Sequence, residues 1–470
     1  MPLKIYNTMT GEEEDFKPIH GNRVNMFVCG PTVYDVTHIG HARTYIAYDI
    51  IARYLRYKGY TLFYLMNITD VDDKIINRAK ERNLNPVDLA QQYSAKFYKD
   101  MASLRINSVN LFAKASEYVA EIIAQVNTLL EKGYAYVVNG DVYYDISKFP
   151  EYGRLSRQKP DELKKHRIEP DPRKRNANDF SLWKSQKLGE LAWDSPWGKG
   201  RPGWHIEDTA ITYTHFGPSY DIHGGAVELV FPHHEAEIAQ AEAATGVKPL
   251  VKYWVHTGIL NVKGRKMSKS LGNFITIEDA LQKYEPDVLR LFFASSHYRS
   301  PIDFSEENLR SSKELLDRVQ ATYDKLQELL ERSQGVTTLQ GSQLIEVVSQ
   351  QKEKFIEAMD DDFNTPAAIA VLVNLTKEVE KSIPSGLDEK TLQRTFDTLK
   401  EMCSIIGLFE RREVKKPSRD ISTELVNLIV EIRDEARGKN DWETSDRIRD
   451  RLKKIGVILE DTAEGTKWRV

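Results

Sequence analysis

Two short segments that lie far apart in the chain carry side chains suited to binding phosphate. His38 and His41 flank Gly40 directly after an apolar run, and Lys266 and Lys269 lie together in a second segment. Imidazole and ammonium N–H groups donate to phosphate oxygens, and glycine lets a flat base approach the backbone closely. Taken singly, a histidine pair is more often a polar helix start, and a lysine cluster a solvated loop.

A third set of residues has the chemistry of a metal site. Cys29 ends the apolar run, and His233 and Glu237 are four residues apart, which predicts one face of a helix that begins near Pro232. A thiolate, an imidazole and carboxylates are typical zinc ligands. The alternatives are that His233 and Glu237 form an ordinary surface pair and that Cys29 is a small buried hydrophobic residue.

The pattern around these residues predicts the elements that position them. Residues 24–29 read as a buried strand, a helix with apolar residues at helical spacing follows, and residues 61–66 read as the next strand. In such parallel units ligands bind at the carboxyl ends of the strands, where helix N-termini favour anions. Another strand is expected at 253–260, before the lysine segment, and no glycine-lysine phosphate loop occurs elsewhere in the sequence.

The pattern changes after Ser305, where apolar residues take helical spacing. Helices are predicted at 343–359, 366–383 and 389–406, so that about 311–410 forms a helical bundle. A polar, basic linker at 411–419 leads to two more helices and a hairpin.

Composition limits the class of protein. A chain of 470 residues with 41% hydrophobic and 29% charged residues is expected to form several globular domains. Two cysteines exclude a disulfide framework, and without a signal-peptide or membrane-spanning pattern we expect a cytoplasmic protein with no membrane partner. The net charge of −4 does not by itself indicate a nucleic-acid partner.

Several segments together carry a resemblance to a known family. His38-Ile39-Gly40-His41 and Lys266-Met267-Ser268-Lys269-Ser270 resemble the two signature sequences of class I aminoacyl-tRNA synthetases. Further segments resemble the cysteinyl-tRNA synthetase family in particular: 29–35, 67–74, 203–208, 221–225 and 231–237.

The resemblance implies an α/β fold. It consists of a Rossmann-like parallel-sheet nucleotide-binding domain at 1–310 with an inserted connective region at about 110–200, an α-helical bundle at 311–410, and a small C-terminal helix-hairpin domain at 420–470 that recognises the anticodon. The implied protein is a monomer.

The implied reaction is activation of L-cysteine with ATP and Mg²⁺ to cysteinyl-adenylate, followed by transfer to tRNA(Cys) with release of AMP and pyrophosphate. The catalytic residues would be His38, His41, Lys266 and Lys269, and Gly40 and Ser268 would join His38, His41 and Lys269 in binding ATP.

The family holds one zinc ion with two cysteines, a histidine and a glutamate, and the ion selects the substrate's thiol. Carried over by position, the ligands are Cys29, Asp208, His233 and Glu237, with Asp208 where the family has its second cysteine. Oxygen is a harder donor than sulfur, so this departure weakens the expectation of zinc over other metals. The substrate-binding residues would be Cys29, together with Thr69 near the amine and Trp204 as the wall of the side-chain pocket.

Three other functions are compatible with parts of the pattern. A ligase of the mycothiol type would pass the adenylate to a small amine, but that type lacks the C-terminal tail. A zinc hydrolase would use Glu235 or Glu207 as the base, which leaves the lysine segment without a role. A non-catalytic tRNA-binding module would not need both phosphate-directed segments.

Overall fold

The computed structural model describes residues 2–158, 172–187, 190–268, 271–332, 341–410, 421–439, 441–454, 457–462 and 465–469. The chain divides into two compact units, Met1–Phe409 and Glu410–Val470, and each is described by itself.

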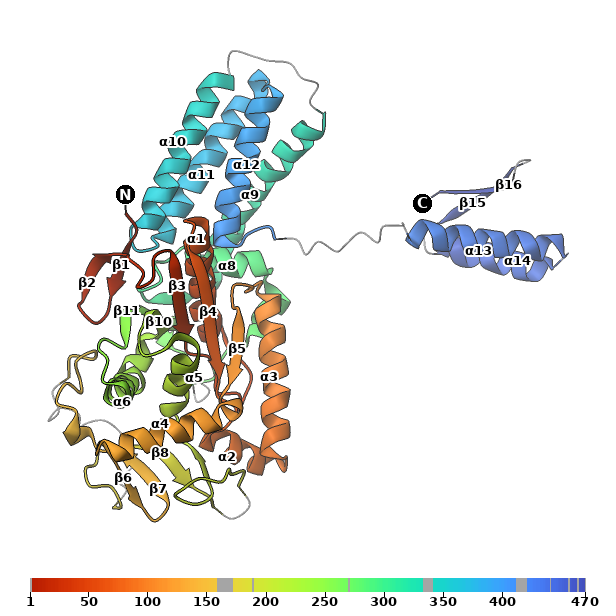
Figure 1. Cartoon of the computed structure of the whole chain (residues 1–470). Coiled ribbons are helices and arrows are strands. Elements are labelled where there is room, and N and C mark those ends of the chain that lie inside the picture. The colour runs from red at the N-terminus through yellow and green to blue at the C-terminus, as the bar shows by residue number, and fades with distance from the viewer. Residues whose placement is uncertain are drawn as a thin grey trace. The chain divides into compact units, whose positions relative to one another are not determined.

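A five-stranded parallel sheet forms the centre of the first unit (Figure 1). Its order is β11 (Val251–Thr257), β10 (Tyr220–Ala226), β3 (Arg23–Val28), β4 (Thr61–Ile68) and β5 (Leu111–Lys114). The central strand β3 is buried along nearly its whole length, as the continuous apolar run predicts for a strand covered on both faces. The predicted α/β fold is confirmed.

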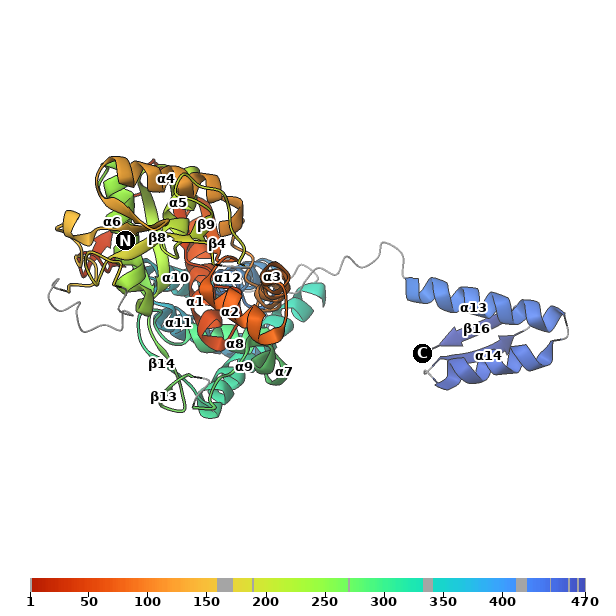
Figure 2. The ribbon, with the colours of Figure 1, turned by 90° about the horizontal axis from the view of Figure 1, so that it is seen from below.

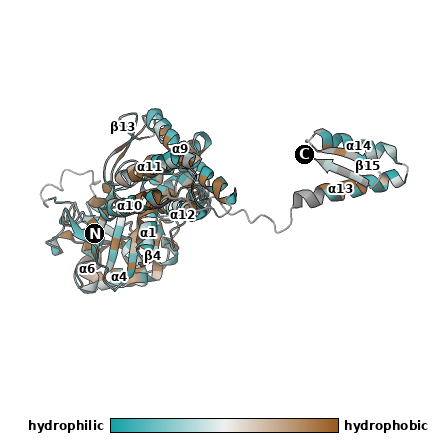
Figure 3. Cartoon of the chain, turned by 90° about the horizontal axis from the view of Figure 1, so that it is seen from above, coloured by the Kyte–Doolittle hydropathy of each residue, from teal (hydrophilic) through white to brown (hydrophobic). Residues whose placement is uncertain are grey.

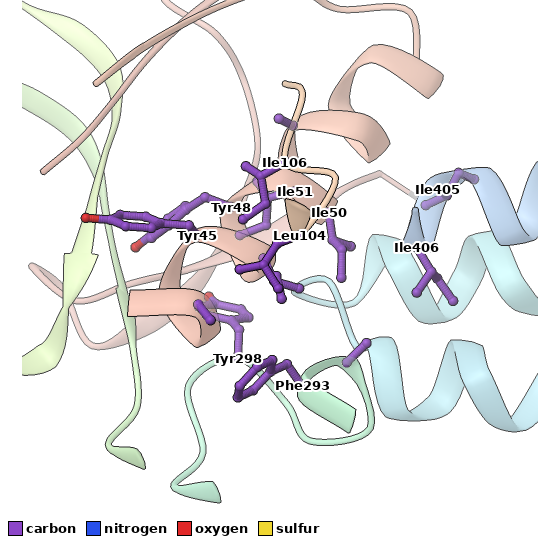
Figure 4. Packing of buried hydrophobic residues seen from close by; sticks show 14 of the residues in the cluster. Tyr45, Tyr48, Ile50, Ile51, Leu104, Ile106, Phe293, Tyr298, Ile405 and Ile406 are labelled. Atoms are coloured by element: carbon purple, nitrogen blue, oxygen red, sulfur yellow. The ribbon is translucent and has the colours of Figure 1, made fainter. Parts of the chain in front are cut away.

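Helix α1 (Ile39–Tyr57) crosses between β3 and β4 and packs into the larger of two apolar cores. Figure 4 shows its Tyr45, Tyr48, Ile50 and Ile51 beside apolar residues of later elements: Leu104, Ile106, Phe293, Tyr298, Ile405 and Ile406. The other elements of this part are α2 (Asp73–Arg82), α3 (Pro86–Ser103), α7 (Ile277–Lys283) and α8 (Pro286–Ala294).

A second apolar core lies on the other side of the sheet, under α4 (Val119–Glu131), α5 (Ile206–Phe216) and α6 (Glu235–Thr245) (Figure 2). It includes an antiparallel sheet of β6 (Ala135–Val138), β7 (Asp141–Tyr144), β8 (Phe180–Ser185) and β9 (Gly200–Pro202). The residues of the predicted insertion at about 110–200 thus divide between two sheets, because β5 pairs with β4 in the main sheet.

Two smaller sheets complete the α/β part. β1 (Lys4–Asn7) pairs with β2 (Glu12–Asp15), and β12 (Leu260–Val262) pairs with both β13 (Arg265–Lys266) and β14 (Ile302–Phe304). The lysine segment therefore begins on β13, an edge strand that pairs with β12, and β12 is itself held on its other side by β14.

Four helices follow as a bundle: α9 (Glu306–Arg332), α10 (Gly341–Asp360), α11 (Thr365–Ser382) and α12 (Glu389–Ile406). Helix α9 begins before the predicted boundary at 311 because the Ser305 carbonyl accepts the first helical bond, from Leu309, and its hydroxyl accepts from the Asn308 N–H.

The second unit contains α13 (Ile421–Gly438), α14 (Trp442–Lys454) and the antiparallel strands β15 (Ile458–Thr462) and β16 (Gly465–Arg469). Arg433 is buried and donates to both carboxylate oxygens of Asp461, at 2.8 and 2.9 Å. Helix α9 carries both hydrophilic and hydrophobic residues along its length (Figure 3). The basic linker predicted at 411–419 lies outside the described residues. In the described part of the chain, no helix has the length and apolar character needed to cross a membrane.

Candidate functional site

A cavity of about 480 Å³ opens at the carboxyl ends of β3, β4 and β10. Both signature segments and most of the predicted pocket residues line it: Cys29, His38, Gly40, His41, Thr69, Trp204, Asp208, His233, Lys266 and Ser268. Phosphate-directed groups and the cysteine-containing cluster therefore share one cavity.

The first signature segment forms the N-terminus of α1. The Gly40 N–H donates to Nδ1 of His38 at 3.1 Å, and the His38 N–H donates to Nδ1 of His41 at 3.2 Å. Because both Nδ1 atoms accept, each neutral ring carries its proton on Nε2, where it can be donated to an anion. Burial and the neighbouring His38 lower the pKa of His41, so this imidazole is neutral.

The residues after the lysine segment pair directly with the first signature. The Ile39 N–H donates to the Ile275 carbonyl at 3.1 Å, the Ile277 N–H donates to Thr37, and Phe274 packs edge-on against His38. Met267 and Ser268 line the cavity, whereas Lys269 and Ser270 lie outside the described residues.

Lys266 makes an ion pair with Glu228, which follows β10 and also lines the cavity. The pair is exposed, with 70% and 54% of the two side chains accessible, so it contributes little to stability. Lys266 can therefore change partners at low cost. Glu228 has no motif of its own, and the sequence analysis missed it.

The predicted metal ligands converge at the buried end of the cavity. Cys29, Asp208, His233 and Glu237 each offer a ligand atom, and these atoms lie within 4.8 Å of one another. Nε2 of His233 lies 2.9 Å from Asp208 and 3.1 Å from Glu237. His233 and Glu237 do not lie on one regular helix, although their spacing predicted one. Helix α6 begins at Glu235, and His233 lies in the π-helical turn before it, where the backbone of Phe231 is not helical.

Two observations test whether this cluster suits a cation. Asp208 Oδ1 and Glu237 Oε1 are buried, and neither makes a hydrogen bond to the described residues; the short contact of Glu237 Oε1 with His233 lacks hydrogen-bond geometry. Burial and the neighbouring carboxylates raise the pKa of both Cys29 and Glu237, since several anions would otherwise meet without compensation. The donor set fits a divalent metal such as zinc, which would supply the missing positive charge.

More histidines surround the cluster than the sequence analysis identified. Nε2 of His234 lies 3.2 Å from the Cys29 sulfur, and Nε2 of His223 lies 3.5 Å from it. The opposite nitrogens of these rings are held by His256 and by the Tyr220 hydroxyl, at 2.8 and 2.7 Å. Cys29, His223, His234 and Glu237 form a second tetrad of the same spacing. The signal was present in the repeated histidines of 221–225 and 231–237.

The residues predicted to contact the substrate lie beside the cluster. The Trp204 ring stacks on His233 with centroids 4.2 Å apart, and Lys74 places its ammonium 5.7 Å from the Trp204 centroid. The Thr69 hydroxyl donates to the buried carboxylate of Glu207, whose pKa is raised by burial. Glu207 therefore orients Thr69, and Lys74 is a cavity-lining cation that the sequence analysis did not identify.

The buried histidines predict a loss of stability in acid. Burial lowers the pKa of His256 to about 3, while the unfolded chain binds a proton near the usual value of 6.5. The unfolded state therefore binds more protons between these values, and stability falls as pH decreases. At pH 5 this one residue should cost about 2 kcal/mol relative to pH 7.5.

Thermal unfolding followed at pH 7.5, 6 and 5 will measure this loss. Replacing His256 by glutamine is expected to reduce the difference between pH 7.5 and pH 5, and replacing the exposed His20 is not. Equal acid sensitivity in the two variants would contradict the assignment.

The fold and the cavity define a class I aminoacyl-tRNA synthetase. A family model described as "tRNA synthetases class I (C) catalytic domain" matches residues 15–314. Two solved structures share the fold. Methionyl-tRNA synthetase of Mycobacterium tuberculosis, in complex with methionyl-adenylate, is 16% identical with a TM-score of 0.59, covering 82% of this chain and 89% of that one. An agnB2 LeuRS of Agrobacterium radiobacter K84 is 12% identical with a TM-score of 0.60, covering 82% and 85%.

Within that class, the chain belongs to the cysteine–tRNA ligase family. The cysteine–tRNA ligase of Thermococcus gammatolerans is 44% identical over 474 residues, which cover 100% of this chain and 99% of the relative. That of Persephonella marina is 44% identical over 488 residues, covering 100% of both. A "DALR domain" matches residues 354–410, and a "Cysteinyl-tRNA ligase anticodon binding domain" matches 422–469. The predicted family and enzyme class are confirmed.

Proposed function

We propose that this enzyme activates L-cysteine with ATP to cysteinyl-adenylate and transfers the cysteinyl group to tRNA(Cys), releasing AMP and pyrophosphate. The observation that carries the proposal is the arrangement of one cavity: anion-directed donors line it together with a buried cluster of a thiol, imidazoles and carboxylates. One substrate with a phosphate group and a second with a thiol suit this cavity.

In the activation step, the cysteine carboxylate attacks the α-phosphate of ATP and pyrophosphate leaves. Negative charge builds on the phosphoryl oxygens, so catalysis depends on positioned donors and cations. His38 and His41 would donate from their Nε2 atoms, and Lys266 would exchange Glu228 for the leaving pyrophosphate, which Lys269 would also bind. Gly40 has no side chain, and a Cβ there would lie 2.9 Å from the His38 ring, so a larger residue would displace this ring and cover backbone that ATP would approach.

At the other end of the cavity, Cys29, Asp208, His233 and Glu237 would hold zinc. The ion would favour the ionised form of the substrate's thiol, which a hydroxyl of the same shape does not provide at neutral pH. Shape alone distinguishes small side chains by only about 1–3 kcal/mol, so the cluster would provide most of the selectivity. Trp204 would close the side-chain pocket, and Thr69, oriented by Glu207, would hold the amine.

The second unit would recognise the tRNA anticodon, and the helical bundle would brace the tRNA. We retain the predicted division into a catalytic domain, a bundle and a C-terminal unit as part of the proposal. Both cysteines of the chain are free and buried, as a reducing compartment favours, and we propose a cytoplasmic monomer.

The zinc-hydrolase alternative assigns Glu235 or Glu207 as a base. Glu235 instead accepts from the backbone N–H groups of Leu155 and Ser156, and Glu207 accepts from Thr69. Both oxygens of Glu235 thus hold the backbone, and Glu207 holds Thr69, so the ligase function is favoured.

Two assays test the proposal in sequence. Exchange of pyrophosphate into ATP should depend on cysteine and not on serine or alanine. Charging should then occur with a tRNA(Cys) transcript and not with small amines such as glucosamine derivatives. Peptidase or amidase turnover without exchange would contradict the proposal.

Replacing Asp208 by cysteine is expected to keep exchange activity within about threefold and to tighten zinc binding about tenfold or more, because zinc prefers the softer thiolate. The measurement is zinc retention in a chelator competition, with a Ser195→Cys variant as the control for an added thiol elsewhere. Loss of both activity and zinc would mean that Asp208 is not a ligand.

A further inference from the structure

Arg43 is a buried arginine in the wall of the cavity. It lies in the second turn of α1, next to the helix start that carries His38 and His41, and its exposed fraction is only 4%. It also lines the cavity itself. A guanidinium so fully removed from water normally requires a carboxylate partner.

The partners of Arg43 are instead backbone carbonyls. Its guanidinium donates to the carbonyl oxygens of Ile259 at 3.5 Å, Tyr298 at 3.1 Å and Ser300. Ile259 directly precedes β12, and Ser300 comes just before β14. Strands β12 and β14 pair with each other, and β12 also pairs with β13, where the lysine segment begins. One side chain thus ties the helix of the first signature to the base of the second.

The other buried arginines of the described residues are each neutralised by an acid. Arg290 donates to Asp49 at 2.6 Å, Arg433 to Asp461, and Arg201 to Asp73. For Arg43, none of the described carboxylates comes within ion-pair distance, and burial is the sole cause that moves its pKa, to about 10. Arg43 therefore remains protonated at neutral pH with its charge uncompensated.

An uncompensated charge in a poorly solvated wall acts strongly on anions in the adjoining cavity. The groups nearest to it along α1, His38 and His41, are the proposed donors to phosphate. The positive charge of Arg43 therefore lacks an anionic partner, which a triphosphate supplies and a neutral nucleoside does not.

We propose that Arg43 is a positioning residue for ATP: it fixes the lysine segment's strand against α1, and its charge makes the cavity select the triphosphate over adenosine. This inference rests on the proposed ATP-dependent activation and assigns a role there to a residue outside both signature segments.

Two variants separate the effect of the positive charge from the effect of the hydrogen bonds to the three carbonyls. Arg43→Met removes both, and Arg43→Lys keeps the charge but cannot reach three carbonyls at once. In pyrophosphate exchange, Arg43→Met should raise the KM for ATP about tenfold and lower kcat about 10- to 100-fold. Inhibition by adenosine and the KM for cysteine should stay within about twofold. Arg43→Lys should recover most of the ATP KM while kcat remains low.

Arg53→Met is the matched control. Arg53 lies on the same helix and also donates to backbone carbonyls, but it is paired with Asp49 at 2.7 Å and lies ten residues further along, about 15 Å by helical rise. Its removal should leave the KM for ATP unchanged.

If Arg43→Met weakens the binding of ATP and of adenosine equally, the substitution has distorted the site in general, and the inference is overturned. It is also overturned if Arg43→Lys does not restore the KM for ATP. If Arg43→Met does not fold, Arg43→Lys decides alone: a near-normal KM with reduced kcat supports the inference, and normal values of both overturn it. Absence of exchange in the unmodified enzyme would instead contradict the proposed function.

Discussion

Replacing Lys269 by alanine is expected to slow adenylate formation about 10²- to 10³-fold while leaving the affinity for cysteine within about twofold. In the sequence Lys269 follows Met267 and Ser268, which line the cavity, and further along Ile275 and Ile277 form backbone hydrogen bonds with Ile39 and Thr37. A cation at this place would act on the leaving pyrophosphate, whose charge develops in the transition state. In the proposed function cysteine would bind at the other end of the cavity, so its affinity should not change.

The measurement combines single-turnover adenylate formation with cysteine binding followed by tryptophan fluorescence. Lys263→Ala is the matched control, because Lys263 is exposed in the β12–β13 turn and is not among the residues that line the cavity. An equal loss in both variants would indicate a general effect of charge. A parallel loss of cysteine affinity in Lys269→Ala would contradict a role confined to the phosphates.

Replacing Cys29 by serine should lower zinc retention sharply and reduce the discrimination between cysteine and serine by about 100-fold or more. The hydroxyl does not ionise as a thiol does, so the cluster loses one anionic ligand. The rings of His223 and His234, which lie beside the Cys29 sulfur, cannot supply the lost negative charge. Without the ion, only shape would distinguish the two substrates, and shape is worth about 1–3 kcal/mol.

Metal content by mass spectrometry and the ratio of kcat/KM for the two amino acids in exchange will check this expectation. The other cysteine provides the control: Cys403 is buried in α12 among apolar residues, and Cys403→Ala should affect stability without affecting zinc. Undiminished cysteine affinity in Cys29→Ser would show that the substrate's thiol is held by something else.

The local elements could be predicted because they depend on neighbours in the sequence. Apolar periodicity placed the strand at 24–29 and the helix at 389–406 within a residue of the observed β3 and α12, and it predicted a helix after that strand, where α1 lies. The domain boundaries stay predictions; helix α9 begins directly after Ser305, where the apolar pattern changes, and β5 pairs with β4 in the main sheet.

The composition of the candidate site was harder to predict from the sequence. Cys29, His233 and Glu237 were grouped by the chemistry of their side chains, and Asp208 joined them only through the family resemblance, because no local pattern relates it to the others. Glu228 and Arg43 carry no motif, and Lys74 was part of a resembling segment without a role of its own; their contacts with Lys266, the residue before β12 and Trp204 were not predicted.

The amino-acid sequence by itself determined the order of strands and helices, the helix start that presents His38 and His41, and the types of donor that could meet phosphate or metal. Those properties arise from backbone periodicity and capping within a few residues. Only the tertiary structure decided which donors share a cavity, because the order β10–β3–β4 brings distant strand ends together. The same packing removes them from water: it raises the pKa of Cys29 and Glu237, so that their charges depend on what binds there, and it leaves the charge of Arg43 without a carboxylate partner.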